Sequence, residues 1–193
     1  SISLPGYFLV SRLDHRDDSG WGGVAAFARN NMADSVTLLG HSDNFERSWL
    51  LLHSDFGPIL LCNFYRPPCQ GEVGSIDSLE EELNMFQNQA VGTIIVGDLN
   101  VHNVRWLRFS SHNSAEGFAL QKLCAEIGMT QSVDKPTRDK HLLDLVVTDI
   151  DSVIKTEILP KIADHNAVLV RLQFAAPTFV ASSRELKKKL PPE

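Results

Sequence analysis

Ile94-Ile95-Val96-Gly97-Asp98-Leu99-Asn100 joins an apolar, strand-like run directly to a polar turn. Residues 93–96 predict a buried strand, and Gly97 permits a tight backbone after it. Asp98 and Asn100 are two positions apart, so in extended geometry their carboxylate and amide face one site. The alternative is a plain strand-to-loop turn, since Gly, Asp and Asn are all common turn residues.

Short apolar runs on both sides of this segment predict mostly strands. The expected strands are residues 7–12, 22–29, 36–41, 48–53, 58–66, 93–96, 142–148, 153–159 and 167–174. Helices are expected over residues 78–89, capped by Ser78, and over 115–127, with Gly128 as the stop. This order suits an α+β sandwich of two sheets with helices outside, and not a regular βαβ alternation.

Length and composition exclude several classes of protein. The chain has 193 residues, 43% of them hydrophobic and 22% charged, which is typical of one globular domain. No apolar run approaches the roughly 18 residues of a membrane helix, and no signal peptide is visible. The net charge of −6 argues against a purely electrostatic nucleic-acid binder. Three cysteines without paired spacing favour neither a disulfide framework nor a zinc site, and indicate a reducing compartment.

The end of the chain has a different composition. Residues 1–174 are expected to form the domain, and 175–193, rich in Pro, Ser and charge, a linker or tail. The run of three lysines at 187–189 is either a nuclear signal or simply a solvated segment.

Two further segments place ionisable side chains at strand ends. Asp164 and His165 precede a predicted strand and make a plausible acid–base or phosphate-contacting pair; the alternative is a hydrogen-bonded surface loop. Asp144 interrupts an apolar strand, and a buried carboxylate is costly unless it has a partner. His165 is one candidate partner, because an Asp often holds a His in one tautomer. An Arg, or exposure at the strand end, is the alternative.

A tyrosine completes the set of candidate functional residues. Asn63 and Tyr65 alternate onto one face of a strand that breaks at Pro67 and Pro68. The phenol could donate to a phosphate oxygen or simply lie at the rim. Together these segments supply Tyr, Asp, Asn, Asp, Asp and His, a combination that suits metal-assisted phosphodiester hydrolysis.

The same segments resemble, in sequence and in order, motifs of the endonuclease/exonuclease/phosphatase superfamily. They are residues 65–68, 97–100, 143–145 and 164–166. More narrowly, residues 4–7, 22–25, 97–106 and 135–138 resemble the apurinic-endonuclease-like domain of non-LTR (LINE-type) retrotransposons. The resemblance covers about residues 2–174. It implies a four-layered sandwich of two mainly antiparallel sheets with flanking helices. It also implies dependence on Mg²⁺, for which Mn²⁺ could substitute, and nicking of DNA to leave a 3′-hydroxyl that primes reverse transcription.

The resemblance also implies roles for individual residues. Asp98 would activate or position the attacking water, and Asn100 would orient it. Tyr65 would contact the scissile phosphate, as would His165, oriented by Asp144. The remaining implied roles are metal binding for Asp164 and substrate binding for Asn63, Arg66, Thr137 and Arg138.

The chain departs from the pattern that it resembles. That pattern begins upstream, with a strand carrying an Asn and another ending in a metal-binding Glu, and neither is present here. Glu46, Glu72 and Glu80 do not stand in a matching context. We therefore expect an N-terminally incomplete domain, weak Mg²⁺ binding and an exposed sheet edge prone to self-pairing.

The expected partners are DNA and a reverse transcriptase domain C-terminal in the same polyprotein, in the nucleus, with no membrane association. Two alternatives stay open: a superfamily phosphatase acting on a lipid or nucleotide, and a catalytically dead truncated copy. The remaining histidines lack partner spacing and are expected at the surface: His15, His41, His53, His112 and His141.

Overall fold

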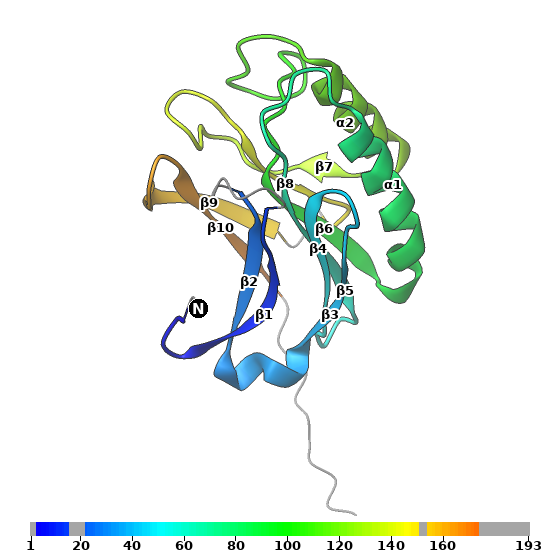
Figure 1. Ribbon diagram of the computed structural model, residues 1–193, viewed down its shortest axis with the longest axis vertical. Coiled ribbons are helices and arrows are strands. Elements are labelled where there is room, and N and C mark those ends of the chain that lie inside the picture. Colours follow the sequence, from blue (N-terminus) through cyan, green and yellow to red (C-terminus); the bar gives the residue numbers. More distant parts are fainter. Residues whose placement is uncertain (1–2, 16–21, 151–153, 174–193) are drawn as a thin grey trace, which may run out of the picture.

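A computed structural model describes residues 3–15, 22–150 and 154–173. The expected tail at 175–193, with its lysine run, lies outside these residues. The described part is an α+β sandwich, as predicted, in which a six-stranded sheet lies between two helices and a pair of hairpins (Figure 1). None of the described helices has the length and apolar character needed to cross a membrane.

The central layer is a sheet with the strand order β3-β4-β5-β6-β8-β7. Its strands are β3 (Val36–His41), β4 (Glu46–Leu52), β5 (Ile59–Tyr65), β6 (Gly92–Asp98), β7 (Thr130–Gln131) and β8 (Asp144–Thr148). Every neighbouring pair is antiparallel except β5 and β6, which run parallel. A parallel pair needs a crossover connection. Helix α1 (Gly74–Phe86) provides most of it, followed by the short 3₁₀ helix η2 (Gln87–Gln89).

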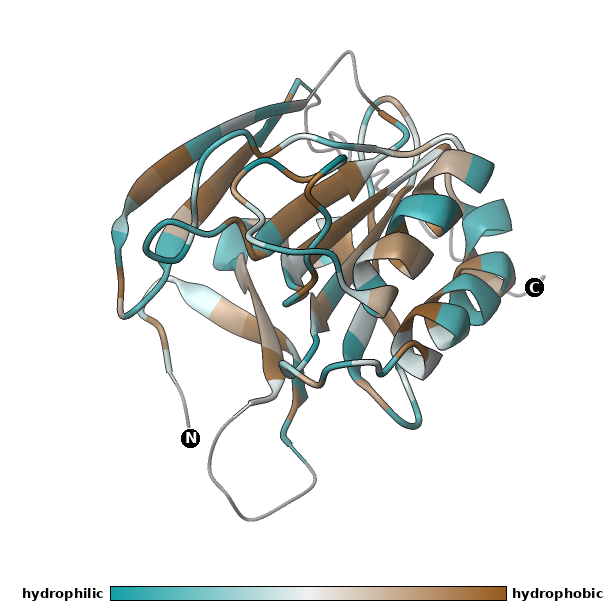
Figure 2. Cartoon of the chain, turned by 90° about the horizontal axis from the view of Figure 1, so that it is seen from above, coloured by the Kyte–Doolittle hydropathy of each residue, from teal (hydrophilic) through white to brown (hydrophobic). Residues whose placement is uncertain are grey.

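The helices α1 and α2 (Ala115–Glu126) lie side by side on one face of this sheet (Figure 1). Leu79 and Leu83 are buried on the sheet side of α1, and the ring of Phe86 lies 5.5 Å from that of Trp49. Figure 2 shows the apolar strands enclosed between the helices and the hairpins. The predicted stripe of residues 79, 83 and 86 therefore forms the interface between helix and sheet.

The start of α1 differs from the prediction. The helix begins at Gly74, four residues before Ser78, so Ser78 is not its cap. The Glu72 carboxylate accepts a hydrogen bond from the Ser75 N–H at 2.7 Å and satisfies one of the donors of the first turn. Two short elements were also not predicted: the 3₁₀ helix η1 (Asn30–Ser35) and strand β7.

Two hairpins cover the other face of the sheet. They are β1 (Tyr7–Leu13) with β2 (Val24–Arg29), and β9 (Ile154–Lys161) with β10 (Asn166–Leu172). The first hairpin is tied to the sheet through polar contacts, including Ser11 Oγ to Ser48 Oγ at 3.0 Å and Asn63 Nδ2 to the Ala25 carbonyl at 3.2 Å. Among the described residues the two hairpins form separate two-stranded sheets.

A buried ion pair joins the sheet to α1. Arg47, fully buried on β4, donates to both carboxylate oxygens of Glu82 at 2.9 and 2.8 Å. Trp49 Nε1 and Ser42 Oγ also donate to this carboxylate, each at 2.6 Å. Burial acts to raise the pKa of Glu82, but the hydrogen bonds from Arg47, Ser42 and Trp49 outweigh it and lower that pKa. Glu82 is therefore held as a fully bonded carboxylate.

We expect Glu82→Ala to lower the free energy of unfolding by about 3–5 kcal/mol, because it leaves the Arg47 charge buried and unpaired. Glu81→Ala, one position earlier on the exposed face of α1, is the matched control and should cost less than about 0.5 kcal/mol. Urea unfolding followed by circular dichroism measures both. Equal midpoints for the two variants would show that the pair does not hold α1 on the sheet.

Candidate active site

Four side chains line up across one end of the six-stranded sheet. Glu46 on β4 is opposite Tyr65 on β5, and Asp98 on β6 is opposite Asp144 on β8. The two pairs meet because the Arg66 N–H donates to the Asp98 carbonyl at 2.9 Å. Residues opposite one another on neighbouring strands share a face. The sheet thus places a phenol and three carboxylates along one row, beneath the hairpins.

The end of β6 is shaped by Gly97. Its φ is +143°, and a Cβ atom there would collide with the Phe64 carbonyl oxygen, so only glycine fits. Asn100 follows in the left-handed region at φ 45°, and its Nδ2 donates to the Arg66 carbonyl at 2.9 Å. The turn that carries Asp98 and Asn100 is therefore bonded directly to the end of β5.

His165 lies between two carboxylates. Its Nδ1 donates to Asp144 Oδ2 at 2.7 Å, and its Nε2 lies 3.8 Å from Asp98 Oδ2. The contact between Asp144 and His165 that the sequence predicted is present. Each of the three side chains offers one ligand atom, and these atoms all lie within 4.8 Å of one another. One imidazole and two carboxylates thus form a compact cluster.

Burial dominates the electrostatics of this cluster. It raises the pKa of Asp98 to about 6; the nearby Asp144 charge adds to the effect, while His165 and hydrogen bonding from Asn100 oppose it. Burial also raises the pKa of Tyr65, with further contributions from Asp98 and Glu46, so the phenol keeps its proton. Asp98 Oδ1 is buried without a hydrogen-bond partner among the described residues.

An open, polar cavity of about 590 Å³ lies over the cluster. The predicted residues that line it are Asn63, Tyr65, Asp98, Arg138, Asp164 and His165. Arg138 Nη2 pairs with Asp164 Oδ2 at 2.9 Å, and both side chains are well exposed. Asp164 Oδ2 is 4.0 Å from His165 Nε2. Asp164 therefore lies at the rim of the cavity and outside the compact cluster.

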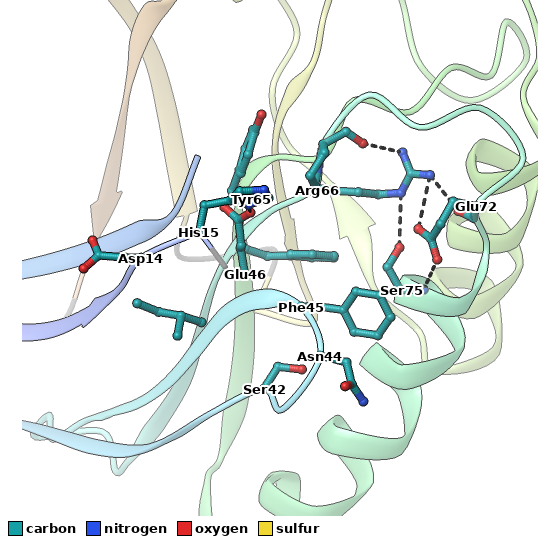
Figure 3. Close-up of a pocket in the computed structure, with 13 residues that line it drawn as sticks. Asp14, His15, Ser42, Asn44, Phe45, Glu46, Tyr65, Arg66, Glu72 and Ser75 are labelled. Atoms are coloured by element: carbon teal, nitrogen blue, oxygen red, sulfur yellow. Dashed lines mark hydrogen bonds and ion pairs between the residues drawn. The ribbon is translucent and has the colours of Figure 1, made fainter. Parts of the chain in front are cut away.

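Two of the residues expected to bind substrate are buried instead. Arg66 is 1% exposed, and its guanidinium donates to Ser75 Oγ at 3.1 Å and to the Glu72 carbonyl at 2.6 Å (Figure 3). Thr137 is fully buried, and its Oγ1 accepts the N–H groups of Leu143 and Asp144 at 3.1 and 3.0 Å. Both side chains hold the backbone beneath the site.

Glu46 is the residue that sequence reasoning missed. It is 8% exposed, and its carboxylate contacts the ring of His15 and the N–H of Gly23, which ties the first hairpin to β4. With Tyr65 it also lines a neighbouring cavity of about 140 Å³ (Figure 3). The register of the hairpin formed by residues 46–52 and 59–65 places it opposite Tyr65, and that register was the available signal.

The donor set suits a hard divalent cation. Asp98 and Asp144 offer carboxylate oxygens, which Mg²⁺ prefers. Asp98 Oδ1 is buried and lacks a partner, which a bound cation would satisfy. The residues present therefore fit a Mg²⁺ ion at this cluster.

Three solved structures share the fold. The endonuclease domain of TRAS1, a telomere-specific non-LTR retrotransposon, superposes with a TM-score of 0.64 at 18% identity, over 88% of this chain and 81% of that one. The human Nocturnin catalytic domain with bound sulfate superposes with a TM-score of 0.55 at 14% identity, over 88% of this chain and 73% of that one. An endonuclease/exonuclease/phosphatase family protein from Bacteroides thetaiotaomicron superposes with a TM-score of 0.55 at 15% identity, over 88% of this chain and 76% of that one.

The described part of the chain therefore has the fold of these structures. Residues 59–169 match the family model described as endonuclease-reverse transcriptase, which covers more than half of the chain. The chain belongs to this family, as its sequence motifs indicated. A comparison with curated protein sequences gives no significant match.

The raised pKa of Asp98 predicts a stability cost at neutral pH. The ordinary pKa of the group is 3.8. Between pH 3.8 and about pH 6, the folded chain therefore holds a proton at Asp98 that the unfolded chain has released. Stability due to this group therefore falls as pH rises through that window. Asp98→Asn cannot titrate, so we expect it to be more stable than the wild type above pH 6, by about 2–3 kcal/mol, and to lose this advantage toward pH 4.

Urea unfolding at several pH values from 4 to 7, in EDTA, measures the difference between wild type and variant. Asp134→Asn, at an exposed carboxylate, is the control for loss of charge and should follow the wild-type curve. If the free energies of unfolding of Asp98→Asn and the wild type differed by the same amount at every pH in this range, the raised pKa of Asp98 would be contradicted.

Proposed function

We propose that this chain is a Mg²⁺-dependent DNA endonuclease domain that nicks target DNA and leaves a 3′-hydroxyl to prime reverse transcription of a retroelement. The observation that carries the proposal is His165 held between Asp144 and Asp98, in an open cavity that Tyr65 also lines. An acid–base pair and a protonated phenol beside one polar cavity suit attack of water on a phosphodiester.

Hydrolysis begins with the water. Asp98 in its ionised form accepts a proton from the attacking water. Asn100 orients this water, since its amide is fixed by the bond from Nδ2 to the Arg66 carbonyl. The water oxygen forms a bond to phosphorus, the bond from phosphorus to O3′ breaks, and O3′ takes a proton from solvent water in the open cavity and leaves as the 3′-hydroxyl.

The phosphate is held by donors from two strands and a loop. Tyr65 donates its phenolic proton to a phosphate oxygen, which its raised pKa permits. His165, with Nδ1–H committed to Asp144, donates through Nε2–H when protonated. Asn63 and Arg138, which line the same cavity, contact the flanking DNA backbone.

Mg²⁺ would be held by Asp98 and Asp144, with Asp164 as a third carboxylate at the rim, and Mn²⁺ would substitute for it. When bound, the cation supplies neutralisation of the charge that develops on the phosphate. DNA is the proposed substrate, and the proposed partner is a reverse transcriptase domain C-terminal in the same polyprotein. Such a reaction takes place in the nucleus, which we propose as the location.

Nicking of supercoiled plasmid tests this function. We expect activity that requires Mg²⁺ or Mn²⁺, is abolished by EDTA, and yields 3′ ends that a DNA polymerase extends directly. Asp98→Asn and His165→Gln should each lower the rate at least about 100-fold, because each removes a group that transfers a proton or stabilises charge. Mg²⁺ is titrated to saturation for each protein.

His53→Gln is the matched control, because the His53 side chain contacts the exposed Thr37 hydroxyl and does not line the cavity over the active-site cluster. It should nick at the wild-type rate. Nicking that survives Asp98→Asn or EDTA would overturn the mechanism. Release of phosphate from a nucleotide or lipid monoester, with intact plasmid, would identify a phosphatase instead.

A further inference from the structure

Three histidines gather beside the N-terminal end of α2, away from the active-site cluster. The rings of His102 and His112 lie 4.2 Å apart between centroids, tilted by 38°. The ring of His141 meets that of His102 edge-on at 5.9 Å. The sequence predicted His112 and His141 at the surface without partners. His112 is exposed, but both rings contact His102, because the loops that carry them meet only in the folded chain.

The backbone holds two of these residues firmly. The carbonyl of His102 accepts the Ser114 N–H at 2.9 Å and packs against Gly117, where a Cβ atom would collide with it. The backbones of His141 and Arg138 are paired: the His141 N–H donates to the Arg138 carbonyl at 2.8 Å, and the Arg138 N–H donates to the His141 carbonyl at 3.0 Å. His112 differs, because it lies in an exposed loop and its Nδ1 contacts only the Ser111 hydroxyl, at 3.0 Å.

Two nitrogens of the cluster lack hydrogen bonds. Nδ1 of His102 and Nδ1 of His141 are shielded from solvent and have no partner among the described residues. Buried polar atoms are nearly always paired, so two orphans in neighbouring rings call for an explanation. Burial, aided by His112 and His141, lowers the pKa of His102, which favours the neutral imidazole that metals bind.

We propose that His102, His112 and His141 bind a borderline-soft transition metal ion of the Zn²⁺ class. Three neutral imidazoles match the ligand preference of Zn²⁺ and not that of Mg²⁺. Glu116, the nearby carboxylate, is occupied by the Gly71 N–H at 3.2 Å and lies 4.0 Å from Arg66. The fourth position therefore goes to water.

Binding of the metal requires a movement of His112. In the described part of the chain, the active-site cluster alone already has its ligand atoms within 4.8 Å of one another. His112 has to turn out of its stacked position, and its exposed loop leaves it free to do so. Once bound, the metal links the loop after Asn100 to the turn before Asp144, and so braces both segments.

Isothermal titration with Zn²⁺ tests the site in an Asp98→Asn background, which removes the competing active-site cluster. We expect one Zn²⁺ per chain, retained in excess Mg²⁺, and a rise in melting temperature of several degrees. Adding His112→Asn should weaken binding at least about tenfold and abolish the rise. Adding His53→Asn, at a histidine that follows β4 and whose side chain contacts Thr37, should change neither.

His112→Asn is expected to fold, since His112 is exposed; an unchanged metal-free melting temperature verifies this. His141→Gln is the second variant, and Cu²⁺ bound in place of Zn²⁺ should show nitrogen coupling in its electron spin resonance spectrum that both variants reduce. Absence of Zn²⁺ binding in the Asp98→Asn chain, or equal affinity with and without His112, would overturn the proposal.

Discussion

The close contact between Gly97 and the carbonyl of Phe64 is the constraint on which the candidate site depends. It lets the end of β6 approach the end of β5, so that Asp98 comes to lie beside Tyr65 and opposite Asp144. Any side chain at residue 97 would force the two strands apart at this point. The row of polar groups across the sheet thus follows from a single missing Cβ atom.

Buried polar side chains then hold that row in position. Arg66 binds the loop that enters α1, and Thr137 binds the N–H of Asp144. The Thr137 carbonyl accepts the N–H of Asn166, next to His165, at 2.7 Å. These bonds hold Asp98 near Asp144 although burial disfavours its charge, so the site is kept in a costly electrostatic state by its surroundings.

Much of this could be predicted from sequence, for identifiable reasons. Strand positions follow from short apolar runs, and Asp98, Asp144 and His165 stand out as ionisable groups at the ends of such runs. The expectations that the structure did not bear out concern contacts between residues that are distant in sequence. Whether Arg66 faces a ligand or Ser75, and whether His102 meets His141, is decided by packing that local patterns do not encode. The start of α1 was missed because the Glu72 side chain, and not a capping Ser, satisfies the first turn.

The parallel pairing of β5 and β6 has a consequence for the order of events during synthesis. The site draws on residues from Asn63 to His165, and the strands that carry them pair across long separations in the chain. Non-local pairing of this kind forms late, because chain entropy has to be overcome first. The imidazole arrives from near the C-terminal end of the described residues, after every carboxylate of the row has left the ribosome. The cluster of Asp98, Asp144 and His165 therefore cannot assemble until synthesis has passed His165.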